Sequence, residues 1–362
     1  MRVALDVSAV PAHVAGAGRY VVEIARRLPA AGVDLALVSR RDDTERWRSW
    51  SPGASVEALV PTGRVPRLLV EAWRLGTTPV ARGATVWHGP HYTMPRRGST
   101  PTVVTVHDLT FFTHPQYHET AKAAFFRRAI RFAAAHAEVL ICVSEFTARQ
   151  LREIVSELPP IVVAPHGVDL ERFHPQSPAS PEVPYALFLG TVEPRKGLDT
   201  LLEAFASVAR DTPELELWLA GQAGWAEGDV RRLIEHHPAR SRIRRLGFVD
   251  DAALPSLLAQ ARAVVYPSRV EGFGLPVLEA MACGAVVVTS SGTVMEEIAD
   301  AAALVCPPGD ASVLAATLQQ AIDLDGEARL DFGRRARKRA EAFTWASSVE
   351  RHLAAYDLAA GR

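Results

Sequence analysis

The chain has 362 residues, of which 48% are hydrophobic, 22% charged and 7% aromatic, a balance that excludes a disordered or fibrous protein. Its 40 basic and 41 acidic residues give a net charge of −1, so we expect no nucleic acid as a partner. The three cysteines form no metal-binding or disulfide pattern, which favours a reducing compartment.

The start of the chain carries Asp6 where a signal peptide would need an apolar run, and no apolar stretch approaches the roughly 18 to 20 residues that span a bilayer. We therefore expect a cytoplasmic protein. The basic, amphipathic segment 64–75 leaves open a peripheral contact with the inner face of a membrane. In that case, charge reversal at Arg67 and Arg74 would weaken binding to anionic vesicles, whereas the favoured interpretation is a helix packed on the first sheet.

Short apolar runs alternate with amphipathic stretches in both halves of the chain. The predicted strands are 3–7, 34–38, 85–88, 102–107, 138–143 and 161–164 in the first half, and 185–189, 215–220, 243–248, 263–266, 285–289 and 303–306 in the second. These runs lack strict alternation, which is typical of parallel strands covered by helices on both faces. The sequence therefore predicts an α/β fold with two doubly wound sheets, whose ligands lie outside the carboxyl ends of the strands.

Prolines crowd residues 165–184, where they disfavour regular structure. This composition predicts a first domain at 1–170, a linker at 171–184 and a second domain at 185–340. We expect the final amphipathic helix, within 341–362, to pack back on the first domain.

The segment EGFGLPVLEAMACG, from Glu271 to Gly284, follows a predicted strand. It predicts a helix that begins near Leu275 or Pro276 and ends near Cys283. Free backbone N–H groups at the start of such a helix form a cradle for an anion or a hydroxyl group. The groups expected to form it belong to Gly272, Phe273, Gly274 and Leu275.

Glu271 and Glu279 flank this cradle, because Glu279 lies about one turn inside the helix and Glu271 enters from the loop. We expect both carboxylates to face one pocket. Such acceptors suit sugar hydroxyls, whereas an acid and a nucleophile would suit glycoside hydrolysis. The structural alternative for Glu279 is compensation of the helix dipole, worth about 0.3 to 1 kcal/mol.

The spacing of Glu271 and Glu279 resembles the signature of the retaining nucleotide-sugar glycosyltransferases of family four, also called glycosyl transferases group 1. Other segments match this family in order. Residues 187–198 resemble its phosphate loop and residues 246–250 its base-side loop, and the further matching segments are 143–147, 165–169 and 343–345. The resemblance covers nearly the whole chain. It implies the GT-B fold, two facing Rossmann-like domains with an interdomain cleft.

The resemblance implies that Gly190 opens the phosphate loop and that Arg195 and Lys196 neutralise the departing diphosphate. Two cations at a turn between a strand and a helix are suited to this task, although a solvated basic pair is the alternative. Many family members have an arginine directly after the glycine. Thr191 stands there in this chain, so we expect Arg195 to supply the guanidinium.

The same resemblance assigns the remaining donor contacts. It implies that Glu279 binds the ribose hydroxyls and that Phe248 and Val249 contact the base. Glu271 and the amides of residues 272–274 would hold the sugar.

In the first half, His107 ends a predicted strand, and the resemblance implies that it contacts the transferred sugar. Asp108 is expected to orient the loop and the imidazole. Gly16 and Gly18 open a helix, and the resemblance implies that they allow close approach to the donor phosphates. The alternative is a tight turn between a strand and a helix, because this segment lacks the third glycine of the dinucleotide fingerprint.

We expect no cofactor and no metal. The one Asp-x-Asp triplet, Asp323 to Asp325, is remote in sequence from the predicted site and is interpreted as a solvated turn. The family resemblance implies retaining transfer of a hexosyl group to a glycan or lipid-linked acceptor. Because residues 190–197 resemble those of bacterial mannosyltransferases, a mannosyl group from GDP-mannose is the first candidate. The alternatives are a noncatalytic nucleotide-sugar-binding subunit and a nucleotide-sugar epimerase.

Overall fold

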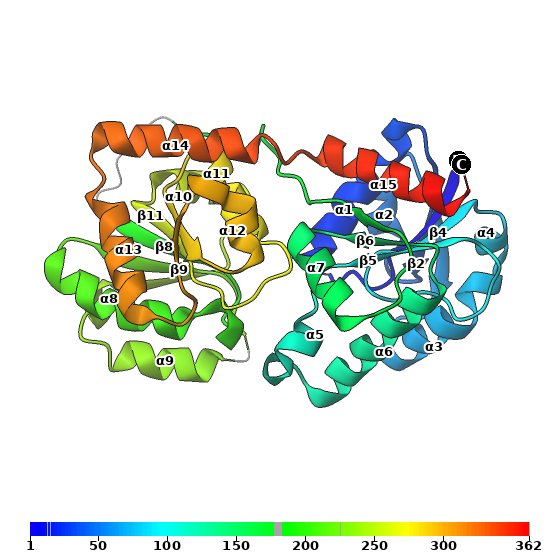
Figure 1. Cartoon of the computed structure of the whole chain (residues 1–362), viewed down its shortest axis with the longest axis horizontal. Helices are drawn as coiled ribbons and strands as arrows, with labels where there is room; N and C mark the ends of the chain where they lie inside the picture. Colours follow the sequence, from blue (N-terminus) through cyan, green and yellow to red (C-terminus); the bar gives the residue numbers. More distant parts are fainter. Residues whose placement is uncertain (13, 15, 177–182, 225, 362) are drawn as a thin grey trace. The chain divides into compact units, whose positions relative to one another are not determined.

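The computed structural model describes residues 1–12, 14, 16–176, 183–224 and 226–361 (Figure 1). The chain divides into two compact units. Unit 1 comprises Met1–Gly167 and Trp345–Arg362, and unit 2 comprises Val168–Thr344. The predicted linker at 171–184 contains residues 177–182, which lie outside the described residues.

The sheet of unit 1 is parallel throughout, with the strand order β3-β2-β1-β4-β5-β6-β7. Its strands are β1 (Arg2–Asp6), β2 (Asp34–Arg40), β3 (Ser55–Val60), β4 (Val86–Gly89), β5 (Thr102–Val106), β6 (Val139–Cys142) and β7 (Ile161–Val163). The sequence predicts six of these seven strands and misses β3. That strand lies at the sheet edge and is largely accessible, so it lacks the continuous apolar run of its neighbours.

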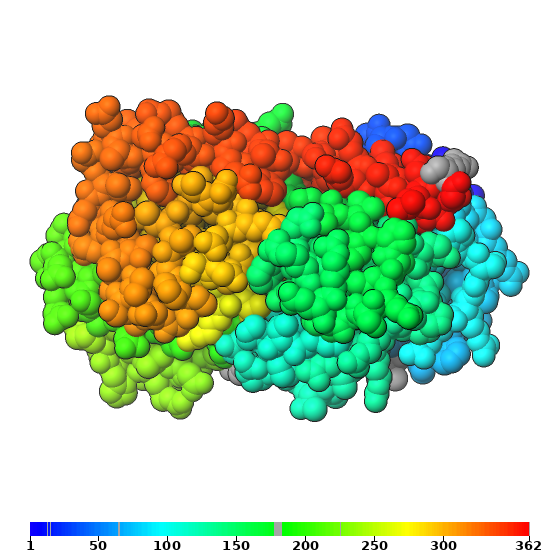
Figure 2. Space-filling model, viewed as in Figure 1, coloured from blue at the N-terminus to red at the C-terminus, as the bar shows by residue number. Residues whose placement is uncertain are grey.

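Helices cover both faces of this sheet (Figure 1). They are α1 (Ala17–Arg27), α2 (Thr44–Trp50), α3 (Arg64–Trp73), α4 (Pro79–Arg82), α5 (Thr110–Thr113), α6 (Thr120–His136), α7 (Glu145–Ile154) and α15 (Trp345–Ala359). Helix α15 comes from the end of the chain and lies on the surface of unit 1, where it is drawn red (Figure 2). Its buried side chains Trp345, Val349 and Tyr356 join the core formed with α1 and the sheet.

The sheet of unit 2 is also parallel, with the strand order β10-β9-β8-β11-β12-β13. Its strands are β8 (Tyr185–Leu189), β9 (Glu216–Ala220), β10 (Ile243–Gly247), β11 (Ala263–Tyr266), β12 (Val287–Ser290) and β13 (Leu304–Cys306). All six were predicted within two residues at each end. In both units the order reverses beside the first strand, which is the topological switch of a doubly wound sheet.

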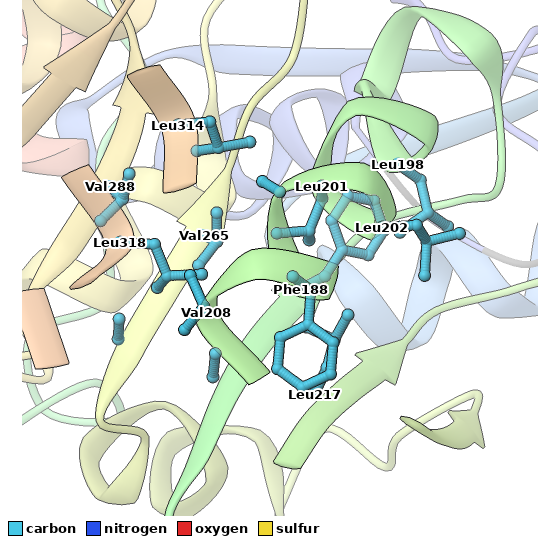
Figure 3. Close-up of a cluster of buried hydrophobic side chains, with 14 of the residues drawn as sticks. Phe188, Leu198, Leu201, Leu202, Val208, Leu217, Val265, Val288, Leu314 and Leu318 are labelled. Atoms are coloured by element: carbon cyan, nitrogen blue, oxygen red, sulfur yellow. The ribbon is translucent and has the colours of Figure 1, made fainter. Parts of the chain in front are cut away.

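The helices of unit 2 are α8 (Leu198–Asp211), α9 (Glu227–Glu235), α10 (Leu254–Gln260), α11 (Leu275–Ala282), α12 (Val294–Ala299), α13 (Ala311–Asp323) and α14 (Gly326–Ala340). Figure 3 shows the core between α8, α13 and the sheet, where Phe188, Leu201 and Leu318 pack among aliphatic side chains. This core holds the strands in place, and the strand order determines which loops are neighbours at the carboxyl ends of the strands. Within the described residues, no helix is both long and apolar enough to span a membrane.

Candidate functional site

The loops after β8 and β11 lie against each other at the carboxyl edge of the unit 2 sheet. A Cβ atom on Gly197 would come within 2.2 Å of the carbonyl oxygen of Pro267, and Gly197 has a φ of 68°, so this approach requires glycine. The backbone N–H of Arg269 donates to the carbonyl of Arg195 at 2.7 Å. These contacts bring the predicted phosphate loop against the loop that leads to Glu271.

Arg269 fastens the two loops together, and sequence reasoning missed it. Its guanidinium donates to the carbonyl of Pro194 at 2.5 Å and to both carboxylate oxygens of Asp199, at 2.9 and 2.7 Å. Asp199 lies in the first turn of α8. A single arginine in a loop gives no signal in the sequence, because most such side chains are solvated.

Within unit 2, three of the predicted site residues form a charged cluster: Arg195, Lys196 and Glu271. Arg195 donates to Glu271 Oε2 at 2.7 Å and to Glu193 Oε2 at 2.8 Å. Lys196 Nζ lies 2.5 Å from Glu271 Oε1 and 2.5 Å from the hydroxyl of Tyr266. The side chains of Lys196 and Glu271 are each only 9% exposed, so these charges face each other largely away from water.

The pKa values of the cluster follow from burial and from these pairs. Burial alone would raise the pKa of Glu271, but Arg195 and Lys196 outweigh it and lower this pKa to about 2. Burial lowers the pKa of Lys196, and Glu271 opposes that shift. For Arg195, Glu271 and Glu193 outweigh burial and raise the pKa above its usual value. Glu271 is therefore ionised and Arg195 cationic at neutral pH.

Helix α11 begins at Leu275 and ends at Ala282, as the sequence predicts. Gly274 precedes it with a φ of 98°, and Pro276 occupies the first turn, where its missing N–H costs nothing. Phe273 is buried and packs against Phe343 within unit 2, with ring centroids 6.2 Å apart. The amides of Gly272 to Leu275 thus lie at the start of a helix whose dipole favours an anion.

Glu279 is buried within α11, with 4% of its surface exposed. Burial and the negative charge of Glu279 together raise the pKa of Cys283 to about 12. The pocket that Glu271 and Glu279 are expected to share stays a prediction.

The loops after β8, β9 and β10 are joined through their backbones. Gly190 N–H donates to the carbonyl of Ala220 at 2.9 Å, and Gly221 N–H donates to the carbonyl of Gly247 at 2.7 Å. A Cβ atom on Gly221 would lie 2.0 Å from the carbonyl oxygen of Gly190, so this junction also requires glycine. The next residue of the β10 loop, Phe248, is 69% exposed, and Val249 beside it is partly buried. An aromatic ring at this edge is open to stacking.

In unit 1, His107 follows β5 and is almost fully buried. Its Nε2 lies 2.7 Å from the carbonyl oxygen of Pro90. A carbonyl only accepts, so Nε2 carries the proton and Nδ1 is left as the acceptor. Burial lowers the pKa of His107, so the ring is neutral. The predicted sugar contact would therefore be a hydrogen bond from a hydroxyl group to Nδ1.

Asp108 orients the loop after β5, in agreement with its predicted role there. Its carboxylate accepts from the hydroxyl of Tyr92 at 2.8 Å and from the N–H of Thr110 at 2.9 Å. The ring of Tyr92 in turn packs edge-on against His107, with centroids 5.6 Å apart.

Gly16 and Gly18 lie at the start of α1 and differ in backbone conformation. Gly16 has a φ of 50°, which disfavours side chains, although a Cβ atom there would meet no atom within 4 Å. Gly18 has a φ outside the left-handed region, and a Cβ atom there would make ordinary van der Waals contacts with Val14, Val10 and Pro11 at 3.5 to 3.7 Å. The turn therefore explains Gly16, whereas packing gives no reason for a glycine at Gly18.

Unit 1 also contains a buried hydrogen-bond chain that sequence reasoning did not predict. His352 Nδ1 lies 2.7 Å from the carbonyl of Ser348, so Nδ1 carries the proton and Nε2 accepts from the hydroxyl of Tyr20 at 2.7 Å. The Tyr20 oxygen must then accept from Thr105 Oγ1 at 2.9 Å. The ring of Tyr20 packs edge-on against His107, with centroids 5.0 Å apart.

The chain continues from Thr105 to the end of α15. Thr105 Oγ1 accepts from His88 Nε2 at 2.8 Å, and His88 Nδ1 accepts from the hydroxyl of Tyr356 at 2.8 Å. Each histidine therefore has a fixed tautomer and is neutral. Protonation of either ring would turn its acceptor nitrogen into a donor, and the tyrosine hydroxyl beside it would have to reverse from donor to acceptor.

A second buried cluster lies at the carboxyl end of β1. Ser8 donates from its hydroxyl to Glu71 at 2.7 Å and from its N–H to Asp6 at 3.0 Å. Arg67 pairs with Glu71 on α3. Burial, together with Asp6, raises the pKa of Glu71 to about 7. Arg67 is therefore the partner of a buried carboxylate and does not project alone as a surface cation.

The outer face of α3 combines apolar and basic side chains. Leu69 and Trp73 are 57% and 46% exposed. The guanidiniums of Arg97 and Arg96 lie 5.0 and 5.9 Å from the centroid of Trp73. This surface, Leu69, Trp73, Arg96 and Arg97, is called the α3 patch below.

The Asp-x-Asp triplet lies between α13 and α14. Asp325 caps α14 by accepting from the N–H of Ala328 at 2.8 Å, and Asp323 accepts from Gln319 at 2.8 Å. Asp325 thus caps α14, whereas Asp323 accepts within the last turn of α13.

Two family models match the chain. Residues 169–339 match the model described as Glycosyl transferases group 1, and residues 14–172 match Glycosyltransferase Family 4. An O-antigen chain mannosyltransferase B of Escherichia coli is 30% identical over 95% of this chain and 96% of its own length. A GDP-mannose-dependent monoacylated alpha-(1-6)-phosphatidylinositol monomannoside mannosyltransferase of Corynebacterium glutamicum is 29% identical over 62% of this chain and 63% of its own.

Among solved structures, a sucrose-phosphate synthase of Thermosynechococcus elongatus covers 100% of both chains at 24% identity, with a TM-score of 0.79. This likeness concerns the fold, which is the GT-B fold of two parallel-sheet, Rossmann-like units.

Proposed function

The chain belongs to the glycosyl transferases group 1 family and is a glycosyltransferase, and from this premise we propose that it moves a mannosyl group from GDP-mannose to an acceptor hydroxyl with retention of configuration. The mannosyl group is supported by the two relatives named above, which are both mannosyltransferases. The guanine nucleotide is supported by the relative described as GDP-mannose-dependent. The acceptor class is a glycan or a lipid-linked glycan.

The observation that carries the proposal is the cluster of Arg195, Lys196 and Glu271. Two cations on adjacent residues can neutralise the diphosphate as its bond to the sugar breaks. A carboxylate ionised at neutral pH can accept hydrogen bonds from the hydroxyl groups of the sugar. The cluster thus holds both chemistries that a nucleoside-diphosphate sugar requires, within one group of loops in unit 2.

The start of α11 and the exposed Phe248 supply the other donor contacts in this proposal. The amides of residues 272–274 would add hydrogen bonds to the sugar and phosphate, favoured by the helix dipole. Glu279 would bind the ribose, and Gly190 would let the diphosphate approach the backbone after β8. Phe248 and Val249 would contact the base.

In unit 1, His107 would accept a hydrogen bond from the transferred sugar at Nδ1, because Pro90 holds its proton at Nε2. Its neutral ring is a poor proton acceptor at the pH of the cell. The departing phosphate would therefore take the proton of the acceptor hydroxyl on the same face of the sugar, which gives retention. Arg195 and Lys196 supply the charge that a divalent metal ion supplies in other transferases, so the proposal requires no metal and no cofactor.

The assays described next also distinguish two other functions. A noncatalytic subunit would bind the nucleotide sugar and leave it intact, and an epimerase would convert the free donor in the absence of any acceptor. The charged cluster favours a catalyst over a binding subunit, because simple binding does not need Glu271 beside both cations.

A donor screen tests the proposal. We expect GDP-mannose to raise the unfolding temperature more than UDP, ADP or dTDP sugars, because a ligand that binds the folded state alone stabilises it. With GDP-mannose and a mannose-terminated oligosaccharide, the proton NMR spectrum of the product should show a new α-mannoside, and EDTA should leave the rate unchanged. Selective stabilisation by another nucleotide sugar would contradict the donor, and a β-mannoside would contradict retention.

The α3 patch is the part of unit 1 that we propose to contact a membrane carrying a lipid-linked acceptor. Its exposed Leu69 and Trp73 can enter the interface, while Arg96 and Arg97 attract anionic headgroups.

We expect flotation with vesicles containing anionic lipid at low salt, and a loss of it in Trp73→Ser with Arg97→Glu. Arg67→Glu is unsuitable for this test because it would break the pair with buried Glu71. The matched control is Leu330→Ser with Arg334→Glu on exposed α14. Equal flotation of wild type and both variants would contradict a contact through this patch.

A further inference from the structure

Tyr266 lies at the carboxyl end of β11 and is 1% exposed. Its hydroxyl oxygen is 2.5 Å from Lys196 Nζ and 3.2 Å from Glu271 Oε1. An ammonium group only donates, so the tyrosine accepts from Lys196 and directs its own proton to Glu271. Lys196 Nζ also lies 4.8 Å from the centroid of the tyrosine ring. One buried side chain therefore contacts both members of the Lys196–Glu271 pair.

Both carboxylate oxygens of Glu271 accept hydrogen bonds from neighbouring side chains. Oε1 accepts from Lys196 and Tyr266, and Oε2 accepts from Arg195. Two of these three side chains are the cations that the proposed function assigns to the diphosphate. Their attraction to a diphosphate exceeds their attraction to one carboxylate, because the ligand carries more negative charge at the same range.

A carboxylate that loses both cations needs another restraint if it is to stay aimed at a sugar. Of the three donors just named, Tyr266 is the neutral one, and burial followed by Glu271 raises its pKa well above the usual value. It keeps its proton, and a diphosphate exerts no comparable pull on it. Its backbone is part of a strand, and Thr289 Oγ1 donates to its carbonyl at 2.9 Å.

We propose that Tyr266 is a positioning residue for sugar transfer, which holds Glu271 in place by a hydrogen bond when Arg195 and Lys196 turn to the diphosphate. This inference rests on the proposed function and assigns a role to a residue outside the signature segment. It separates two tasks within the cluster. The cations bind the diphosphate, and the tyrosine keeps the carboxylate directed at the sugar.

The test compares GDP with GDP-mannose, which differ by the mannosyl group. In Tyr266→Phe, the Kd for GDP should stay within about threefold of wild type, because both cations remain. The Kd for GDP-mannose should rise and kcat should fall, each by about 10- to 100-fold, the usual effect of losing a residue that orients a site. Titration calorimetry gives the two Kd values, and GDP release with a mannose-terminated oligosaccharide gives kcat.

Tyr185→Phe is the matched control. The hydroxyl of Tyr185 donates to the carbonyl of Leu257 at 2.8 Å. Tyr185 is buried at the amino end of β8, whereas the charged cluster lies at the carboxyl ends of the strands. We expect wild-type affinity and turnover from this variant. Tyr185→Phe therefore measures the general effect of deleting one buried tyrosine hydroxyl from unit 2, against which Tyr266→Phe is compared.

Several results would overturn the inference. Wild-type turnover and wild-type GDP-mannose affinity in Tyr266→Phe would show that the hydroxyl positions nothing. Equal losses of affinity for GDP and GDP-mannose would show a structural role only. A wild-type chain that binds neither GDP nor GDP-mannose would instead contradict the proposed function, and with it this inference, before any variant is compared.

Discussion

Replacing Glu271 by glutamine is expected to lower the rate of mannosyl transfer by about 10²- to 10³-fold, the range found when one charged or polar contact to a reacting group is removed. The amide keeps the shape of the side chain but loses the charge that pairs with Arg195 and Lys196. GDP affinity should be unchanged or higher, because a negative charge beside the diphosphate is removed. The measurements are kcat with GDP-mannose and an acceptor, and the Kd of GDP.

Glu216→Gln is the matched control, since Glu216 is a buried carboxylate of unit 2 that pairs with Arg244 and accepts from Trp218 at the amino end of β9. It should lose stability without a specific loss of transfer. If Glu271→Gln transfers mannose as fast as wild type, the cluster has no part in the chemistry. If wild type and variant are equally inert while GDP still binds, the chain is a nucleotide-binding subunit.

Mild acid is expected to unfold unit 1 before unit 2. Burial is the largest cause that lowers the pKa of five histidines in unit 1, to about 4 for His352 and about 3 for His91, with His88, His107 and His166 also shifted down. A folded-state pKa below the unfolded value means that the unfolded chain binds more protons. Stability is therefore lost as the pH falls below about 6.5, and the loss continues to about pH 4 for His352 and to about pH 3 for His91.

The size of this effect follows from the number of groups. Once the same histidine is protonated in the unfolded chain, each buried neutral histidine lowers the free energy of unfolding by about 1.4 kcal/mol per pH unit. Asp6 and Glu71 act in the opposite direction, because burial raises their pKa values and the folded state then gains protons in acid. They offset two histidines at most. The five histidines outnumber these two carboxyl groups, so the net effect of acid on unit 1 is a loss of stability.

Hydrogen exchange at pH 7.5 and pH 5, corrected for the intrinsic rates, measures this difference. We expect β1, β4, β5 and β6 to lose protection at pH 5, while β8 and β11 keep theirs, because none of the described histidines of unit 2 is buried. His352→Gln should lessen the loss, and His236→Gln on the exposed end of α9 should not. Equal protection of both units at pH 5 would contradict this prediction.

The sequence predicts those parts of the site that lie close together along the chain. Glu271, the glycines after it and the start of α11 are contiguous, and the phosphate loop follows a clearly apolar strand. Their positions follow from the rule that loops gather at the carboxyl ends of parallel strands. The same rule does not specify which side chains touch, so Tyr266 and Arg269 could not be recognised.

The buried chain of unit 1 shows a second limit. Tyr20, His88, Thr105 and His352 come from α1, β4, β5 and α15, and no spacing links them. Each histidine alone is indistinguishable from an ordinary core or surface residue. The fold itself was accessible because apolar runs of four to six residues mark buried parallel strands. The partly exposed edge strand β3 lacks such a run and was missed.

The central claim is that Arg195 and Lys196 hold the diphosphate while Glu271 faces the sugar. A crystal structure of the wild-type chain with GDP-mannose measures this directly. We predict that phosphate oxygens lie within hydrogen-bond distance of Arg195 and Lys196, and that a mannose hydroxyl lies at the same distance from Glu271. A bound donor with both cations still paired to Glu271, and its diphosphate held by other residues, would contradict the account.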